Sequence, residues 1–296
     1  MITFEAFSEK IRKGIAEYYG ESYQVEIHKI RKNNGMIYPG LTIGNENSNL
    51  SPTIYLQPMY EQYKEGKPFC EIIQEVIRIY GESKIEGRVD LRFFTDFSQV
   101  RERVACKLIN YETNKELLSS VPHVRFLDLA LVCYYRILHD MLGSATILVR
   151  FVNMNLWGIS EEQLFALAKE NTRRMSAPRI ESVDQIMESM AGTQTVVHRE
   201  EQQSQMYVLT NERKLFGAAA ICFPDVLQQF SEQMKTNFYL LPSSVHEVIL
   251  LPEGIESPEE LRRLVCNMNR TQVRPEEILS DSVYYYDRER EKLTIL

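Results

Sequence analysis

The sequence predicts an α+β protein with mixed or mainly antiparallel sheets and flanking helices. Three kinds of pattern support this class. Apolar residues recur every three or four positions behind N-cap residues, short segments alternate apolar and polar residues, and turns rich in Asn or Gly separate such segments. No repeat of fixed period and no low-complexity segment occurs, so neither a solenoid nor a disordered tract is expected.

An amphipathic helix is predicted at the start of the chain, behind Thr3 as its N-cap. Its apolar stripe consists of Phe4, Phe7, Ile11, Ile15 and Tyr18. A hairpin should follow, because alternating residues from Tyr23 lead into Lys32-Asn33-Asn34-Gly35, where Asn and Gly accept the positive φ of a tight turn. Residues 36–43 would return antiparallel to the first strand.

Three further elements complete the first part of the chain. Residues 52–56 predict a short strand, and its proline favours an edge position or a strand start. Residues 58–64 and 68–80 predict two helices, the second with one apolar face.

The middle of the chain is less clearly patterned. Asp96 with Gln99 suggests a capping box that opens a helix carrying Val100, Val104 and Leu108. Residues 126–137 and 145–152 are rich in β-branched and aromatic residues and predict central strands, although the first segment also fits a helix.

The last part of the chain shows the clearest capping signals. Ser160 with Gln163, Ser182 with Gln185, and Ser257 with Glu260 each predict a helix start. A helix is also predicted over residues 224–234, strands over 206–210, 238–241 and 245–251, and a terminal hairpin over 283–286 and 293–295.

The best candidate for a domain boundary lies at residues 81–90, where apolar density drops and charges alternate. This predicts an N-terminal helix, hairpin, strand and helix unit over residues 1–85 and a larger α+β domain over residues 91–296. A loop within a single domain would explain the same break.

Composition excludes several functional classes. The 296 residues include 34 basic and 41 acidic ones, a net charge of −7, so nucleic acid is not expected as a partner. Charged residues, among them Asp128 and Arg136, interrupt the longest apolar stretch, residues 126–142. No transmembrane helix and no membrane partner is therefore expected.

The cysteine pattern points to a reducing compartment. The five cysteines are scattered singly, mostly in apolar stretches, and no two have C-x-x-C spacing. We expect most of them to be buried core thiols. Because residues 1–5 also lack the pattern of a signal peptide, a cytoplasmic location is expected.

One cluster of polar residues is a candidate catalytic site. Ser243, Ser244, His246 and Glu247 place hydroxyl, imidazole and carboxylate groups within five residues. In a strand, Ser244 and His246 would share a face about 7 Å apart, which is poor geometry for direct proton transfer. The alternative is a turn before a strand, in which the serines satisfy backbone groups.

No metal site and no cofactor is expected. His139-Asp140 resembles the metal-binding dyad of HD-type phosphohydrolases, but the additional ligands of that site are not apparent. The sequence contains neither a Walker-type phosphate loop nor a G-x-G-x-x-G dinucleotide motif.

A run of aromatic residues offers a candidate surface for self-association. If Tyr284-Tyr285-Tyr286 forms a strand, successive rings point to opposite faces, so at least one ring is exposed or meets a partner. A homo-oligomer through this segment is one interpretation, and packing within an edge strand is the other.

Several phrases along the chain resemble an uncharacterised domain family found chiefly in clostridial and other gut Firmicutes. They are Ser51–Leu56, Tyr60–Gly66, Leu108–Tyr111 with Asn114, Pro122-His123, Phe126–Leu129, Trp157–Ser160, Asn171-Thr172, Leu241–Glu247 and Leu279–Tyr286. The resemblance implies a bacterial, cytoplasmic protein. It implies no activity, cofactor or catalytic residue.

The sequence leaves open whether the protein is an enzyme. The lack of catalytic and cofactor motifs favours a non-enzymatic binding or regulatory protein with a protein or small-molecule partner. The alternative is a hydrolase or transferase with a site around Ser243 to Glu247.

Overall fold

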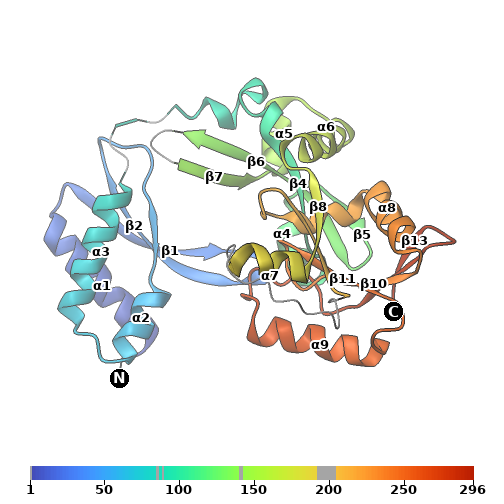
Figure 1. Ribbon diagram of the computed structural model, residues 1–296. Coiled ribbons are helices and arrows are strands. Elements are labelled where there is room, and N and C mark those ends of the chain that lie inside the picture. The colour runs from blue at the N-terminus through green and yellow to red at the C-terminus, as the bar shows by residue number, and fades with distance from the viewer. Residues whose placement is uncertain (1, 85–86, 89, 140–142, 192–204) are drawn as a thin grey trace. The chain divides into compact units, whose positions relative to one another are not determined.

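The computed structural model describes residues 2–84, 87–88, 90–139, 143–191 and 205–296. Contacts within the chain divide it into two compact units (Figure 1). Unit 1 comprises Met1–Phe93 and Leu138–Ser144, and unit 2 comprises Phe94–Ile137 and Ala145–Leu296. Whether residues 1–85 and 91–296 are separate folding domains stays a prediction.

The predicted α+β class is confirmed, because helices and antiparallel sheets occupy different segments of the chain. Sheets of three, four and six strands are present in the described residues. No helix of these residues is long and apolar enough to span a bilayer.

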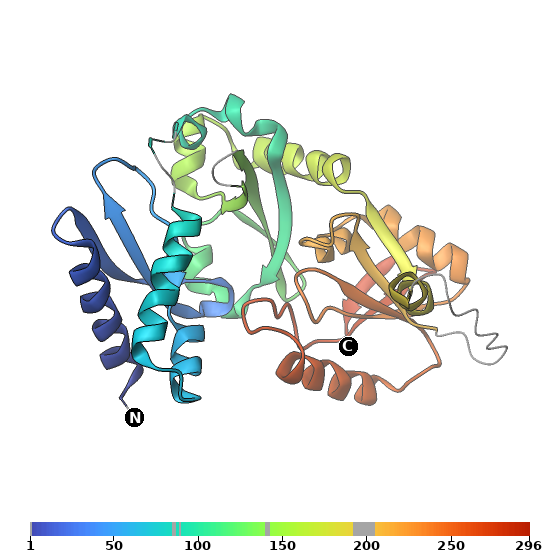
Figure 2. The ribbon, with the colours of Figure 1, turned by 60° about the vertical axis from the view of Figure 1, so that its left-hand side comes forward.

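Unit 1 contains a three-stranded antiparallel sheet in the order β1-β2-β3, and α1 and α3 lie side by side (Figures 1 and 2). Its elements are α1 (Phe4–Tyr19), β1 (Tyr23–Arg31), β2 (Ile37–Asn45), β3 (Thr53–Tyr55), α2 (Gln57–Lys64) and α3 (Phe69–Ser83). The predicted helices, hairpin and edge strand of this region are therefore confirmed.

The start of unit 1 follows its local signals closely. Thr3 caps α1, since its hydroxyl accepts a hydrogen bond from the Ala6 N–H at 3.2 Å. Asn34 (φ 58°) and Gly35 (φ 66°) take the positive φ values expected of the turn between β1 and β2. Of the predicted stripe of α1, Phe7, Ile11 and Ile15 are buried, Phe4 is half-buried and Tyr18 is exposed.

In unit 2, strands β4, β6 and β5 form a sheet in that order, and β7 pairs with β6. The strands are β4 (Val104–Asn110), β5 (His123–Phe126), β6 (Leu129–His139) and β7 (Gly143–Leu148). Between β4 and β5 lies the short helix α4 (Lys115–Leu118), and α5 (Phe151–Trp157) follows β7. The predicted strand over 145–152 is therefore confirmed only in its first half.

The helix predicted from Asp96 through Leu108 is wrong. Asp96 does cap, but only a 3-10 turn, Phe97–Gln99, and residues from Val104 onward form β4. Five of the seven residues of β4 are buried, on both of its faces. A strand buried on both faces has no alternation, so its apolar residues also fit a helical spacing.

The second sheet of unit 2 has the order β13-β12-β10-β11-β9-β8. Its strands are β8 (Pro178–Ser182), β9 (Tyr207–Asn211), β10 (Phe238–Leu241), β11 (Val248–Pro252), β12 (Tyr284–Asp287) and β13 (Lys292–Ile295). The predicted terminal hairpin is confirmed as β12 paired with β13.

Helices cover both faces of this six-stranded sheet. Successive residues of β10 point to opposite sides, so Phe238 and Tyr239 mark the two faces. On one face the Phe230 ring of α8 (Pro224–Met234) meets Phe238 edge-on at 4.9 Å. On the other face, Leu261 and Val265 of α9 (Pro258–Thr271) join the same apolar cluster as Tyr239.

The remaining helices of unit 2 begin where the capping signals predicted. In α6 (Glu161–Met175) and α9, reciprocal bonds join the N-cap serine to the residue three positions later. Ser182 and Gln185 make the same pair of bonds at the start of α7 (Val183–Ala191).

A tight contact lies where the 3-10 helix η6 (Gly217–Cys222) begins. A Cβ atom at Gly217 would meet the Thr210 hydroxyl, and would lie 2.6 Å from the His246 carbonyl oxygen and 2.7 Å from the Asn211 nitrogen. Two of these neighbours are backbone atoms, which cannot move aside independently.

We therefore expect Gly217→Ala to lower the free energy of unfolding by about 2 kcal/mol or more, because a methyl group overpacks this contact. Urea denaturation followed by the fluorescence of Trp157, the one tryptophan of the chain, measures the effect in unit 2. Gly81→Ala is the control, since its Cβ would meet open space in unit 1. Equal transitions for both variants would contradict the prediction.

Candidate functional site

A cleft of about 370 Å³ lies within unit 2 and is the main candidate for a functional site. Three segments enclose it: the turn after β5, the junction of η6 with α8, and the hairpin of β12 with β13. The lining residues are Arg125, Phe126, Leu127, Ile221, Cys222, Pro224, Leu227, Gln228, Tyr286, Glu291, Lys292 and Leu293. Ligand pockets in proteins commonly measure about 300–1,000 Å³, so this cleft is large enough for a small molecule.

The first wall of the cleft is a two-residue hairpin turn between β5 and β6, in which Phe126 pairs with Leu129. Leu127 has φ 56°, a conformation that residues other than Gly and Asn rarely adopt. Such a backbone costs free energy and persists only where surrounding contacts enforce it.

The contacts that enforce this turn are made by Asp128. Its carboxylate accepts hydrogen bonds from the hydroxyls of Ser280 at 2.6 Å, of Ser282 at 3.0 Å, and of Tyr284. Burial and the Asp128 carboxylate raise the pKa of Tyr284 far above its usual value, so this hydroxyl stays protonated and donates. The wall of the cleft is thereby fixed to the segment that leads into β12.

The second wall begins α8. Pro224 occupies the first turn of the helix, where its missing N–H and fixed φ are favourable. Ile221 and Leu227 are buried, whereas Cys222 and Gln228 are half-buried at the cleft surface. Burial raises the pKa of the Cys222 thiol, so the floor of the cleft carries no charge there.

The third wall is the turn between β12 and β13. The Asp287 carboxylate accepts hydrogen bonds from the backbone N–H groups of Glu289 and Arg290, both at 3.0 Å. Glu291 has φ 49°, and the Gln228 side-chain amide donates to its carboxylate at 3.0 Å. The second and third walls are therefore joined by a direct hydrogen bond.

The rim of the cleft carries two cationic side chains, Arg125 and Lys292, both exposed. The Arg125 guanidinium lies 3.9 Å from the centre of the Tyr111 ring, and its Nε donates to the Leu127 carbonyl at 3.1 Å. These contacts hold its position and leave its terminal nitrogens without a hydrogen bond to any described residue.

The predicted catalytic residues occupy the turn before β11, and the structure does not gather their side chains. Ser243 is buried, and Glu247 is exposed. The Ser244 hydroxyl accepts a hydrogen bond from the backbone N–H of His246 at 3.1 Å. Among the described residues, no hydrogen bond joins this hydroxyl to the imidazole.

The imidazole of His246 is held by other partners. Its Nδ1 accepts a hydrogen bond from the Phe216 backbone N–H at 3.2 Å, and the two rings stack with their centres 5.4 Å apart. Nδ1 is therefore unprotonated, and Nε2 carries the proton and faces the Glu277 carboxylate at 3.7 Å. The Ser244 contact with a backbone N–H is the kind expected of a turn, whereas His246 is half-buried and not on an exposed face. Catalysis by Ser244 and His246 stays a prediction without a supporting contact.

No group of three or more metal-ligating side chains occurs in the described part of the chain. The side chains of His139 and Asp140, considered above as a metal dyad, lie outside it. A second cavity, of about 20 Å³ and lined in part by Cys106 and Arg213, has room for one water molecule.

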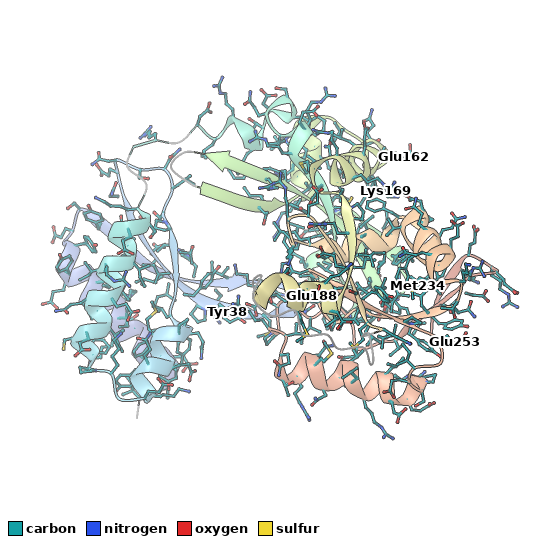
Figure 3. The ribbon with its side chains drawn as sticks, viewed as in Figure 1. Tyr38, Glu162, Lys169, Glu188, Met234 and Glu253 are labelled. Atoms are coloured by element: carbon teal, nitrogen blue, oxygen red, sulfur yellow. The ribbon has the colours of Figure 1, made fainter. Side chains whose placement is uncertain are left out.

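The aromatic run of β12 is an interior strand of its sheet, between β10 and β13. Tyr284 and Tyr286 are buried, and Tyr285 is half-buried. The Tyr285 hydroxyl donates to the carboxylate of Glu253 at 3.0 Å. Glu253 directly follows β11 and is labelled in Figure 3. Contacts within the chain thus account for all three rings, and self-association through them stays a prediction.

Sequence reasoning missed the cleft and the role of Asp128. The cleft residues come from three segments that have no shared motif, and Asp128 contacts residues more than 150 positions away. One signal could have indicated the turn: Asp128 follows Leu127 between two strand patterns, and Asp is common in turns.

We expect Asp128→Ala to lower the free energy of unfolding by about 3 kcal/mol, because three hydroxyls lose a charged acceptor and Tyr284 is buried. Ser282→Ala, which removes only one donor, should cost about 1 kcal/mol or less. Urea denaturation followed by Trp157 fluorescence compares them, and equal losses would refute the central role of Asp128.

We expect His246→Ala to lower the free energy of unfolding by about 2 kcal/mol, since the Phe216 N–H loses its acceptor and Phe216 its stacking partner. Ser244→Ala should cost less than about 1 kcal/mol. The same denaturation assay measures both. An ester-hydrolysis activity of the wild type that Ser244→Ala abolishes would contradict this structural role.

Comparison with known proteins identifies a family but no function. Residues 4–288 match the model of a family of unknown function, DUF5688. No curated protein and no solved structure matches the chain significantly. The resemblance to an uncharacterised family, predicted from phrases along the whole chain, is confirmed in this respect. The chain therefore belongs to DUF5688.

Proposed function

We propose that this protein is a binding protein whose ligand is a small amphipathic anion held in the cleft between the β5–β6 turn, α8 and the β12–β13 hairpin. The observation that carries the proposal is the combination of an apolar floor with two exposed cationic side chains, Arg125 and Lys292, among the residues that line the cleft. The apolar part of the ligand covers the floor, and its carboxylate or similar group meets the cations.

The floor supplies apolar surface for the body of the ligand. Ile221, Leu227 and Tyr286 are buried beneath it, and Phe126 and Leu293 are half-buried on its sides. Burial of apolar ligand surface contributes about 25 cal/mol per Å², so a small hydrocarbon body gains useful affinity here. Walls of this kind are typical of small-molecule sites.

The rim supplies the preference for an anion. Neither Arg125 nor Lys292 forms an ion pair with another described residue, whereas Glu291 is engaged by Gln228. A guanidinium with free terminal nitrogens can bind a carboxylate through two parallel hydrogen bonds. Stacking on Tyr111 orients Arg125 before the ligand arrives, which reduces the entropy lost on binding.

Two strained residues stand on different walls of this cleft, which also supports a function there. Leu127 and Glu291 both have positive φ, and both line the cleft. Backbone strain clusters at functional sites, where precise placement of the walls offsets its cost.

The alternative function, a hydrolase or transferase around Ser243 to Glu247, has no supporting contact and is not proposed further. A cytoplasmic location in a bacterial cell belongs to the present proposal. All five cysteines are free thiols, which fits a reducing compartment.

We expect the full chain to bind anilinonaphthalene sulfonate, an apolar anion, with an increase in dye fluorescence. Arg125→Gln combined with Lys292→Gln should weaken this binding about tenfold or more, because the sulfonate loses its charged partners. Arg288→Gln is the matched control, since it removes one charge from the same hairpin outside the cleft.

A neutral dye separates the two parts of the site. Phenylnaphthylamine lacks the sulfonate, so the charge variants should not change its binding, whereas Leu293→Trp, which fills the cleft, should weaken both dyes. The proposal is wrong if Leu293→Trp leaves both dyes bound as in the wild type, or if neither dye binds the wild type.

A further inference from the structure

Two buried cysteines face each other across adjacent strands of unit 2. In the antiparallel pairing of β4 with β6, Cys106 lies directly opposite Cys133. The exposed fraction is 2% for Cys106 and 0% for Cys133. Side chains that are directly opposite in an antiparallel pair project from the same face of the sheet.

The backbone hydrogen bonds identify the type of pair. The Cys106 N–H donates to the Thr172 hydroxyl of α6 at 2.8 Å, and the Cys133 carbonyl accepts from the Val149 N–H at 2.9 Å. Both groups point away from the opposite strand, so this is a non-hydrogen-bonded pair. The Cα atoms of such pairs are about 4.5 Å apart, within the range of about 4.4–6.8 Å that disulfides span.

We propose that Cys106 and Cys133 are a redox modification site, at which the two thiols close a reversible cross-strand disulfide by exchange with a low-molecular-weight disulfide such as glutathione disulfide. One protein thiolate attacks a sulfur of the small disulfide, breaks its S–S bond and releases one small thiolate. The second protein sulfur then attacks the mixed disulfide and displaces the other small thiolate.

The protein dithiol loses two electrons and two protons, and the small disulfide gains both and leaves as two thiols. An excess of small thiol reverses the same steps, so a reducing compartment keeps the pair as thiols.

The surroundings make this exchange slow in the folded protein. Burial and the neighbouring Cys106 thiol raise the pKa of Cys133, and the cavity beside Cys106 holds only about 20 Å³. A small disulfide therefore reaches the pair when the strands open or while the chain folds.

The link has a direct consequence for the cleft. The loop that it closes runs from Cys106 to Cys133 and contains the rim residue Arg125 and the turn at Leu127. Oxidation therefore ties both ends of the segment that forms the first wall. This inference does not depend on the proposed function, because the disulfide forms whether or not the cleft binds a ligand.

The test is to refold the chain from denaturant in a buffer of reduced and oxidised glutathione, and to map disulfides by mass spectrometry of alkylated peptides. Cys70→Ser combined with Cys266→Ser serves as background, because these two exposed thiols would otherwise link separate molecules. We expect a Cys106–Cys133 link in the folded product, and a midpoint of thermal unfolding raised by roughly 5–10 °C over the reduced protein.

Single variants decide which thiols are paired. Cys222→Ala is the matched control, since it removes a third thiol of the same unit, and it should leave the link and the thermal shift unchanged. Cys133→Ala should abolish both. The proposal is overturned if the folded Cys70→Ser, Cys266→Ser protein has Cys106 and Cys133 as free, alkylated thiols at every ratio of reduced to oxidised glutathione. It is also overturned if every disulfide found includes Cys222.

Discussion

The Asp128 carboxylate is the contact on which the arrangement of unit 2 depends. It belongs to the turn of the four-stranded sheet, yet its three donors come from the segment that enters the six-stranded sheet. The Asn110 side-chain amide donates to the Leu279 carbonyl at 3.0 Å beside it. A charged acceptor with three hydroxyl donors is stronger than the same number of neutral bonds, so it fixes the two sheets against each other.

This contact also explains how a leucine persists with positive φ at the tip of the β5–β6 hairpin. The three hydroxyls hold Asp128 in place, and Leu127 beside it closes the two-residue turn with φ 56° and stands in the wall of the cleft. The same turn presents its carbonyl to Arg125, which is stacked on Tyr111. Support of the turn, shape of the cleft and position of the cation are therefore one connected arrangement.

Local sequence patterns predicted most elements, because the hydrogen bonds of a helix cap or a tight turn form between residues only a few positions apart. Ser160 and Ser257 cap their helices, and Asn34 makes the turn between β1 and β2, through contacts within a few residues. The helix predicted over residues 96–108 was wrong because tertiary contacts, and not local ones, determine the structure there. Except for Lys107, the residues from Val104 to Ile109 are apolar, because tertiary neighbours cover both faces of the strand. A strand buried in this way lacks the alternation of apolar and polar residues by which a strand is recognised.

The sequence by itself determined the α+β class, the helix starts, the hairpins and the membership of a family along nearly the whole chain. Only the tertiary structure decided what meets across long separations: the cleft walls, the hydroxyls around Asp128, and the facing thiols of Cys106 and Cys133. It also turned the imidazole of His246 toward Phe216 and away from Ser244. The physical reason is that strand register and packing between sheets set these distances, and neither leaves a short-range pattern in the chain.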